Sequence, residues 1–258
     1  MSHTITFIGC GNMGANMAQM LAKKHQVRLY DRHLEKAKAL ADEIGAVACS
    51  TVGEAVQDAD YILLCVKPQD LKEVSASLFG KVRDSQTVVS ILAGVQLSTL
   101  SQHLGSVKLL RMLPNTACAY GKGIVAIVEE KNGNSKEVEE VFSDLGRVIW
   151  VPEKQANAVS ALGGSGLAFV FMIVESFVDA GLAMGLQAEQ AKTIALEMIT
   201  GAVEVMNQTG KSPSELKWQV TSPAGCTIAG VKQMEDESVR SGLINTILAT
   251  HDRFLEME

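Results

Sequence analysis

Thr4-Ile5-Thr6-Phe7-Ile8-Gly9-Cys10-Gly11-Asn12-Met13-Gly14 is the stretch that decides the fold. A β-branched and aromatic run leads directly into Gly-x-Gly-x-x-Gly, and apolar residues recur behind it at helical spacing. The stretch predicts a strand, a tight turn and a helix. Gly9 permits the turn, Gly11 lets the backbone approach a pyrophosphate, and Gly14 lets the helix pack on the strand. Free amides at the helix start then point toward the phosphates.

The next apolar run supplies the context that this motif needs. Residues 27–30 form a second predicted strand, and it ends in Asp31, 20 positions after Gly11. An acidic residue at this distance is typical of one that faces the adenosine ribose in dinucleotide-binding proteins. The two runs together predict a bound dinucleotide in contact with the loop residues Cys10, Asn12 and Met13 as well as the glycines, rather than a glycine-rich turn without a ligand.

Composition limits the partners and the compartment. The 258 residues are 47% hydrophobic and 20% charged, which suits a soluble chain with two cores. A net charge of -6 provides no basic surface for nucleic acid or an anionic membrane. The five cysteines lack C-x-x-C spacing, no Cys/His cluster has the spacing of metal ligands, and we expect no signal peptide before the first strand. These features predict a cytoplasmic protein with no metal site.

Strand and helix patterns alternate up to Pro152, which predicts a doubly wound parallel sheet in a Rossmann-type domain, residues 1–152. In such sheets the ligand lies beyond the carboxyl ends of the strands. Candidate cofactor contacts therefore include the strand-exit residues, which are Asp31, Arg32, Val66, Lys67, Pro68, Ala93, Gly94 and Asn115.

From residue 153 to 258 the pattern is helical and largely apolar, with a glycine-rich kink at residues 163–166 and a predicted helix from 228 to 258 that breaks near Ser241 and Gly242. The uncharged run 155–174 is long enough to raise the possibility of a membrane span, but its polar residues favour a buried helix. One small bundle cannot bury so much apolar surface. This second domain therefore predicts a partner subunit.

Residues 221–227, Thr-Ser-Pro-Ala-Gly-Cys-Thr, are the best candidate for a substrate site. Small hydroxylated residues and glycine before a helix offer amides and hydroxyls that suit a carboxylate, although an N-capping turn with Ser222 or Thr227 as the cap explains the same pattern. Glu153, at the domain junction, is a second candidate for the pocket.

These motifs, taken together and in order, resemble pyrroline-5-carboxylate reductases. The matching stretches are residues 8–14, 66–68, 90–95, 112–116, 164–166, 179–181 and 220–227, and they run in the family's order over nearly the whole chain. The resemblance implies reduction of the cyclic imine pyrroline-5-carboxylate to proline by hydride from NADPH or NADH, the last step of proline synthesis. It also implies a homodimer through interlocked helical domains, within a larger ring in some members.

The resemblance also implies roles for single residues. Thr227 matches the threonine that hydrogen-bonds or protonates the imine nitrogen, and Ser222, Gly225 and Cys226 match the loop that holds the substrate carboxylate. Glu153 matches a pocket glutamate. Hydride addition to C=N produces a basic amine, so a proton donor or an orienting hydroxyl is needed nearby.

Several residues depart from the family pattern. Leu167 and Phe169 replace a proline and a tyrosine, Trp218 replaces an acid, and Ala224 replaces a glycine. Ala117 and Val52 depart likewise, from a proline and an asparagine. The first four lie in the helical domain, so they allow a different cyclic imine as substrate or weak activity.

Cofactor choice and two rival functions stay open on the sequence. Asp31 favours NADH, whereas Arg32 beside it suits the 2′-phosphate of NADPH. A β-hydroxyacid dehydrogenase shares the opening motif and the helical second domain, but it needs a lysine after the glycine-rich kink and this chain has none there. A dinucleotide-binding paralogue with little catalysis is the other alternative.

Overall fold

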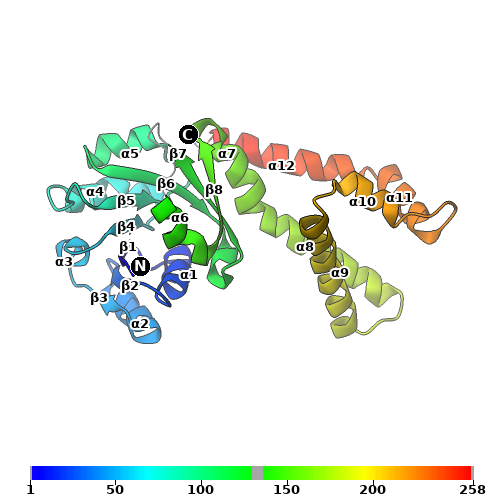
Figure 1. The fold of residues 1–258 in the computed structure, drawn as a ribbon, viewed down its shortest axis with the longest axis horizontal. Coiled ribbons are helices and arrows are strands. Elements are labelled where there is room, and N and C mark those ends of the chain that lie inside the picture. The colour runs from blue at the N-terminus through cyan, green and yellow to red at the C-terminus, as the bar shows by residue number, and fades with distance from the viewer. Residues whose placement is uncertain (1, 130–135, 257–258) are drawn as a thin grey trace. The chain divides into compact units, whose positions relative to one another are not determined.

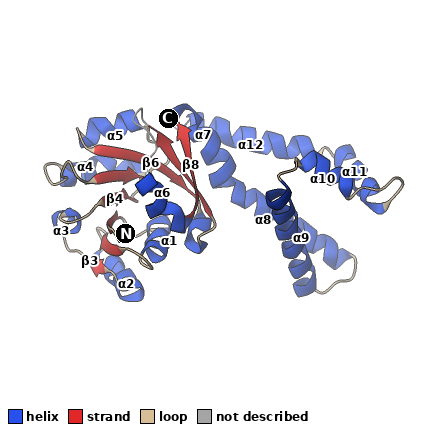
Figure 2. Ribbon diagram, viewed as in Figure 1, coloured by secondary structure: helices blue, strands red, loops and turns tan. Residues whose placement is uncertain are grey.

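The computed structural model describes residues 2–129 and 136–256. It contains two compact units, Met1–Gly164 with His251–Glu258, and Ser165–Thr250. Strands occur only in the first unit among the described residues, and the second is made of helices (Figure 1, Figure 2). The predicted combination of a Rossmann-type sheet and a helical domain is confirmed. The end of the helix predicted to reach residue 258 lies outside the described residues.

The first unit is built on an eight-stranded sheet in the order β3-β2-β1-β4-β5-β6-β7-β8. Every neighbouring pair is parallel except β6 and β7. The strands are β1 (Thr4–Ile8), β2 (Gln26–Tyr30), β3 (Val47–Ala48), β4 (Tyr61–Leu64), β5 (Thr87–Ser90), β6 (Lys108–Pro114), β7 (Gly123–Glu129) and β8 (Gly146–Pro152).

The antiparallel β6–β7 pair departs from the wholly parallel sheet that we predicted. Only a 3₁₀ turn, Thr116–Tyr120, and a few flanking residues connect the two strands. A parallel neighbour needs a crossover of about a dozen residues or more, so this short connection returns the chain in the opposite direction.

Helices cover both faces of the sheet because its strands bury alternate side chains on opposite sides. In β1, Ile5 and Phe7 enter one core with α1, α2 and α6, whereas Ile8 enters the other core with α3, α4 and α5. The helices of this unit are α1 (Asn12–Leu21), α2 (Leu34–Ile44), α3 (Val52–Val56), α4 (Leu71–Leu78), α5 (Leu97–Leu104), α6 (Lys136–Phe142) and α7 (Ala156–Val159).

The glycine-rich kink is a π-helical segment, Ser160–Ser165, between α7 and α8. A Cβ on Gly163 would lie 2.8 Å from Cγ2 of Ile124, so any other residue there would force the Ile124 side chain to shift. The helices beyond it are α8 (Gly166–Ala183), α9 (Ala188–Thr209), α10 (Pro213–Gln219), α11 (Cys226–Asp236) and α12 (Val239–Glu256).

The last predicted helix breaks a few residues earlier than expected. Ser238 takes a left-handed conformation with φ of 56°, which separates α11 from α12. Ser241 and Gly242 instead lie inside α12, where the Ser241 hydroxyl donates to the carbonyl of Ser238. A serine bonded in this way is compatible with the first turn of a helix.

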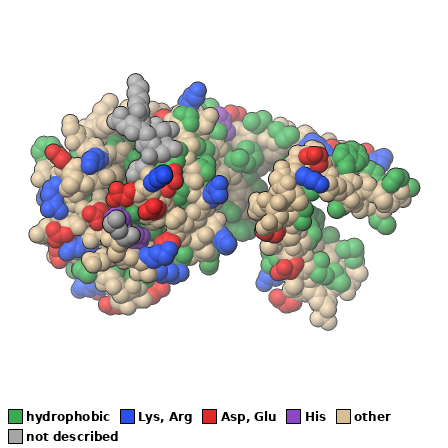
Figure 3. All heavy atoms as spheres, in the orientation of Figure 1, with side chains coloured by type: hydrophobic (Ala, Val, Ile, Leu, Met, Phe, Trp, Pro, Cys, Tyr) green, Lys and Arg blue, Asp and Glu red, His purple; other side chains and the backbone are tan. Residues whose placement is uncertain are grey.

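The prediction that the apolar run at residues 155–174 is buried is wrong within one chain. The helical stretch Glu153–Ala183 is long and apolar enough to cross a membrane, with a mean hydropathy of 1.8, yet only 6% of that apolar window is buried. Phe171 and Met172 are 64% and 69% exposed. Figure 3 shows further hydrophobic side chains on the surface of the second unit. An uncovered apolar surface of this extent is typical of a protein that associates.

One charged side chain lies in the interior of the first unit. Arg111, in the middle of β6, is 1% exposed, and Nη1 of its guanidinium donates to Oε1 of Glu153, directly after β8. Arg111 Nε and Glu153 Oε2 are buried without a hydrogen-bond partner among the described residues. The pair therefore spans β7 and fixes the start of the helical segment to the sheet.

Replacing Glu153 with alanine should lower the free energy of unfolding by about 3 kcal/mol, because it leaves a buried guanidinium without its counter-charge. Glu153→Gln should cost less, since its amide oxygen can still accept from Arg111. The double variant Arg111→Met with Glu153→Ala should recover much of the loss. Urea unfolding at one protein concentration measures all three; a Glu153→Ala protein as stable as the parent would contradict this account.

Candidate functional site

The turn after β1 is held by close backbone contacts. Gly9 has φ of 108°, a region that favours glycine, and a Cβ there would lie 2.6 Å from the carbonyl oxygen of Cys65. Its N–H donates to the carbonyl of Tyr30 at 2.7 Å. A Cβ on Gly14 would approach the carbonyl oxygen of Gly9 to 2.3 Å. Both glycines are thus required so that β1, α1 and the exits of β2 and β4 can meet.

The start of α1 forms a cradle for an anion. Gly11 is its N-cap, makes no side-chain capping hydrogen bond, and has no atom within 4 Å of the position where a Cβ would lie. The first amides of a helix have no acceptor inside it, and its N-terminus carries a partial positive charge. The open space and the unpaired amides therefore fit the pyrophosphate of a dinucleotide.

Asp31, at the exit of β2, is held by two backbone amides. Its Oδ2 accepts from the N–H of Cys10 and its Oδ1 accepts from the N–H of His33, each at 2.9 Å. Each carboxylate oxygen has two acceptor positions, so both keep one for a ligand hydroxyl. The carboxylate is thereby fixed beside the glycine-rich turn.

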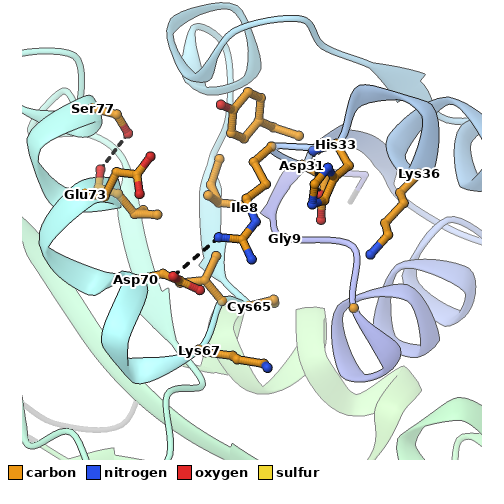
Figure 4. Close-up of a pocket in the computed structure, with 15 residues that line it drawn as sticks. Ile8, Gly9, Asp31, His33, Lys36, Cys65, Lys67, Asp70, Glu73 and Ser77 are labelled. Carbon is orange, nitrogen blue, oxygen red and sulfur yellow. Dashed lines mark hydrogen bonds and ion pairs between the residues drawn. The ribbon is translucent and has the colours of Figure 1, made fainter.

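A cavity opens at the exits of β1, β2 and β4 (Figure 4). Six of the predicted cofactor residues line it, namely Gly9, Gly11, Asp31, Arg32, Val66 and Lys67. The other lining residues are Ile8, Tyr30, His33, Lys36, Cys65, Asp70, Glu73, Val74 and Ser77. The structure thus brings together predicted residues from three separate strand exits.

The remaining predicted cofactor residues do not line this cavity; they are Cys10, Asn12, Met13, Gly14, Pro68, Ala93, Gly94 and Asn115. Cys10 contributes its amide to Asp31 and Gly14 contributes close packing. Asn115 is 7% exposed, and its Nδ2 donates to the carbonyl of Gly163 at 2.8 Å, so this side chain ties the exit of β6 to the π-helical segment. Their roles as cofactor contacts stay predictions.

Sequence reasoning missed two pairs of polar, ionisable lining residues. His33 and Lys36 lie at the start of α2, and Asp70 and Glu73 lie at the start of α4. Helix starts that follow strand exits share the ligand-binding edge with those exits. Reading one turn past each exit would have found them.

The thiols near the cavity are not nucleophiles at neutral pH. Burial, with a smaller contribution from Asp31, raises the pKa of Cys10 to about 12. Burial likewise raises the pKa of Cys65. Both side chains therefore stay protonated, and of the two only Cys65 lines the cavity, as an apolar group. No group of three His, Cys, Asp or Glu residues able to hold a metal ion occurs in the ranges that the structure describes.

The predicted substrate loop joins α10 to α11 in the second unit. Gly225 is the N-cap of α11 and makes no side-chain capping hydrogen bond, so the expected cap by Ser222 or Thr227 is not formed. A Cβ on Gly225 would lie 2.3 Å from Oγ of Ser222, and its N–H donates to the carbonyl of Ser222 at 3.1 Å. The loop thus folds tightly on itself and leaves the first-turn amides of Cys226 and Thr227 without a side-chain cap.

Two departures from the family pattern are visible in this loop region. Ala224 has φ of 57°, a left-handed conformation that costs an alanine about 1–2 kcal/mol and a glycine much less. Trp218 is 62% exposed, and Nζ of Lys217 lies 4.9 Å from its ring centroid. The backbone at position 224 thus keeps the left-handed conformation that suits glycine, although alanine stands there in this chain.

Two family models match the chain. One, described as pyrroline-5-carboxylate reductase dimerisation, matches residues 153–257, and the other, described as NADP oxidoreductase coenzyme F420-dependent, matches residues 4–94. Pyrroline-5-carboxylate reductase of Methanosarcina acetivorans is 32% identical over 98% of this chain and 97% of its own length. That of Corynebacterium melassecola is 31% identical over 98% of each chain.

Solved structures agree over the full length. A pyrroline-5-carboxylate reductase from Coxiella burnetii has a TM-score of 0.88 at 27% identity and covers 100% of this chain and 99% of its own. The Plasmodium falciparum pyrroline carboxylate reductase, solved with NADP bound, has a TM-score of 0.85 at 26% identity and covers 99% and 98%. A 3-hydroxyisobutyrate dehydrogenase reaches 0.55 at 21% identity, which reflects shared fold alone.

Relatives above 30% identity span almost the whole sequence, the helical half matches the dimerisation model, and the first unit has a cradle that fits a dinucleotide. The chain therefore belongs to the pyrroline-5-carboxylate reductase family and forms homo-oligomers through its helical domain.

Proposed function

We propose that this protein reduces 1-pyrroline-5-carboxylate to L-proline with NADH or NADPH, as the last step of proline synthesis in the cytoplasm. The observation that carries the proposal is the uncapped first turn of α11 directly after the tight Ser222–Gly225 turn. A small anionic substrate in an acidic protein needs such a local anion site. The named relatives support the choice of substrate.

The substrate carboxylate is assigned to the start of α11. The amides of Cys226 and Thr227 and the hydroxyl of Ser222 are its donors, because the N–H of Gly225 is already committed to the carbonyl of Ser222. Gly225 contributes by letting Ser222 approach, since any side chain there would collide with the Ser222 hydroxyl.

Thr227 is assigned to the imine nitrogen. The bound nicotinamide supplies the hydride, and the nitrogen must carry a proton for the amine to form. A threonine hydroxyl is too weak an acid to supply that proton by itself. Thr227 therefore orients an already protonated iminium or passes on a proton from water. We also propose Glu153 as a substrate-binding residue, because its side chain is 33% exposed, is held by Arg111 and carries a negative charge that favours a cationic substrate nitrogen.

We further propose a preference for NADH over NADPH. Asp31 is fixed at the exit of β2 with acceptor positions free for ribose hydroxyls, and its charge opposes a 2′-phosphate. Arg32, next along the chain, provides the cation that still allows NADPH to be used.

The helical domains are proposed to interlock into a homodimer, which builds into a larger ring. Large apolar side chains of α8 and α9 are exposed in the single chain, among them Phe171, Met172 and Ile194. A second copy covers this surface, which accounts for the apolar helix without a membrane.

The direct test of the function is oxidation of NADH and of NADPH by the purified protein with pyrroline-5-carboxylate. Thr227→Val should lower kcat/KM by about 100-fold while the Kd for the dinucleotide stays within about twofold, because the hydroxyl acts on the substrate alone. Thr227→Ser, which keeps the hydroxyl, is the matched control and should retain most of the rate. Equal turnover by Thr227→Val and the parent would remove the residue's assigned role.

Phe171→Asp should shift the protein toward monomers in light scattering coupled to size exclusion, because it places a charge in the proposed interface. Phe79→Asp is the control, since Phe79 is 83% exposed in the dinucleotide-binding unit and outside the helical domain. An unchanged mass for Phe171→Asp would place the subunit interface elsewhere.

A further inference from the structure

The cation closest in sequence to Asp31 already has a partner. Arg32 lines the dinucleotide cavity, and its Nη1 lies 3.6 Å from Oδ1 of Asp70 at the start of α4. Figure 4 marks this ion pair with a dashed line that ends at Asp70. The guanidinium that would accept a 2′-phosphate is thus held by a carboxylate of the protein itself.

Asp70 has no competing structural role among the contacts of the described residues. It precedes α4 in the N-cap position but makes no side-chain capping hydrogen bond, although aspartate there usually caps the helix. Its side chain is 24% exposed and that of Arg32 is 66% exposed. The Asp70 carboxylate is therefore available to pair with Arg32, and the exposed Arg32 side chain can break this pair to bind a ligand.

A 2′-phosphate can bind Arg32 only if the ion pair between Arg32 and Asp70 breaks, and the carboxylates near the cavity oppose that exchange. Asp31 is fixed by the amides of Cys10 and His33, so its carboxylate cannot withdraw. A 2′-phosphate therefore meets one fixed carboxylate at Asp31 and a second at Asp70, and it gains Arg32 only when that side chain breaks its pair. NADH, which has hydroxyls there, meets neither penalty.

We propose that Asp70 is a specificity-determining residue that holds Arg32 away from NADPH and so favours NADH. This inference rests on the proposed use of nicotinamide dinucleotides, and Asp70 acts through Arg32 rather than on the reacting atoms. Exposed or partly exposed ion pairs are weak, so the preference is modest and both cofactors bind.

The test is the Kd of NADH and of NADPH, measured by nicotinamide fluorescence without substrate. Asp70→Asn should lower the Kd for NADPH by about three- to tenfold and leave that for NADH within about twofold, because it releases Arg32 and removes one negative charge. Asp70→Ser is a second variant with the same expected effect. In the Arg32→Ala background, Asp70→Asn should give a smaller gain for NADPH, since the cation it would release is absent.

Glu73→Gln is the matched control. Glu73 lines the same cavity from α4, and no ion pair with Arg32 is found for it in the described part of the chain. If the control improves NADPH binding as much as Asp70→Asn, the effect comes from net charge and the inference is overturned. An unchanged ratio of the two Kd values in Asp70→Asn also overturns it.

The Kd measurement and the turnover assay test the two proposals separately. A shifted Kd ratio without consumption of pyrroline-5-carboxylate supports the role of Asp70 and rejects the reductase function. Consumption of pyrroline-5-carboxylate with an unchanged ratio of the two Kd values in Asp70→Asn supports the reductase function and rejects the role of Asp70. Failure of the parent protein to bind either dinucleotide overturns both.

Discussion

The pair of Arg111 and Glu153 is the interaction on which the arrangement of the first unit depends most. It joins the middle of β6 to the residue that follows β8, across the one antiparallel junction in the sheet. A fully buried guanidinium is costly to desolvate, so this position tolerates few substitutions that leave one charge behind. The same contact holds Glu153 at the junction from which the helical segment begins. The contact that joins these strands therefore also sets the position of a candidate substrate residue.

The dinucleotide site is built differently, from backbone rather than from buried charge. Gly9 and Gly14 allow main-chain atoms of three strand exits to meet, and the Cys10 amide then holds the carboxylate of Asp31. Side chains at the rim, such as Arg32, are exposed by comparison. Close backbone contacts therefore form the floor of the site, whereas exposed charged side chains form its edge and can change without disturbing that floor.

The sequence predicted the elements of the first domain well because each has a strong local signal. Gly45, for example, ends α2 in the left-handed conformation that glycine tolerates, and Thr51 begins α3 as an N-cap whose hydroxyl accepts from the N–H of Glu54. The direction of β7 was missed, since strand direction depends on connection length rather than on side chains. The pairs Arg111 with Glu153 and Arg32 with Asp70 join residues far apart in the chain, and no periodicity indicates such contacts. Exposure of α8 was missed because apolar residues look alike whether their own chain or another copy covers them.

The cysteines of this protein differ sharply in accessibility. Cys49 and Cys118 are buried, Cys10 and Cys65 are partly buried with raised pKa values, and Cys226 is exposed at the start of α11. A maleimide or a small environment-sensitive dye would therefore label Cys226 before the other four thiols. In the single chain, Cys226 is thus a natural attachment point for an optical reporter on the loop assigned to the substrate, and the rate of its labelling in the homo-oligomer would report whether a second copy covers this loop.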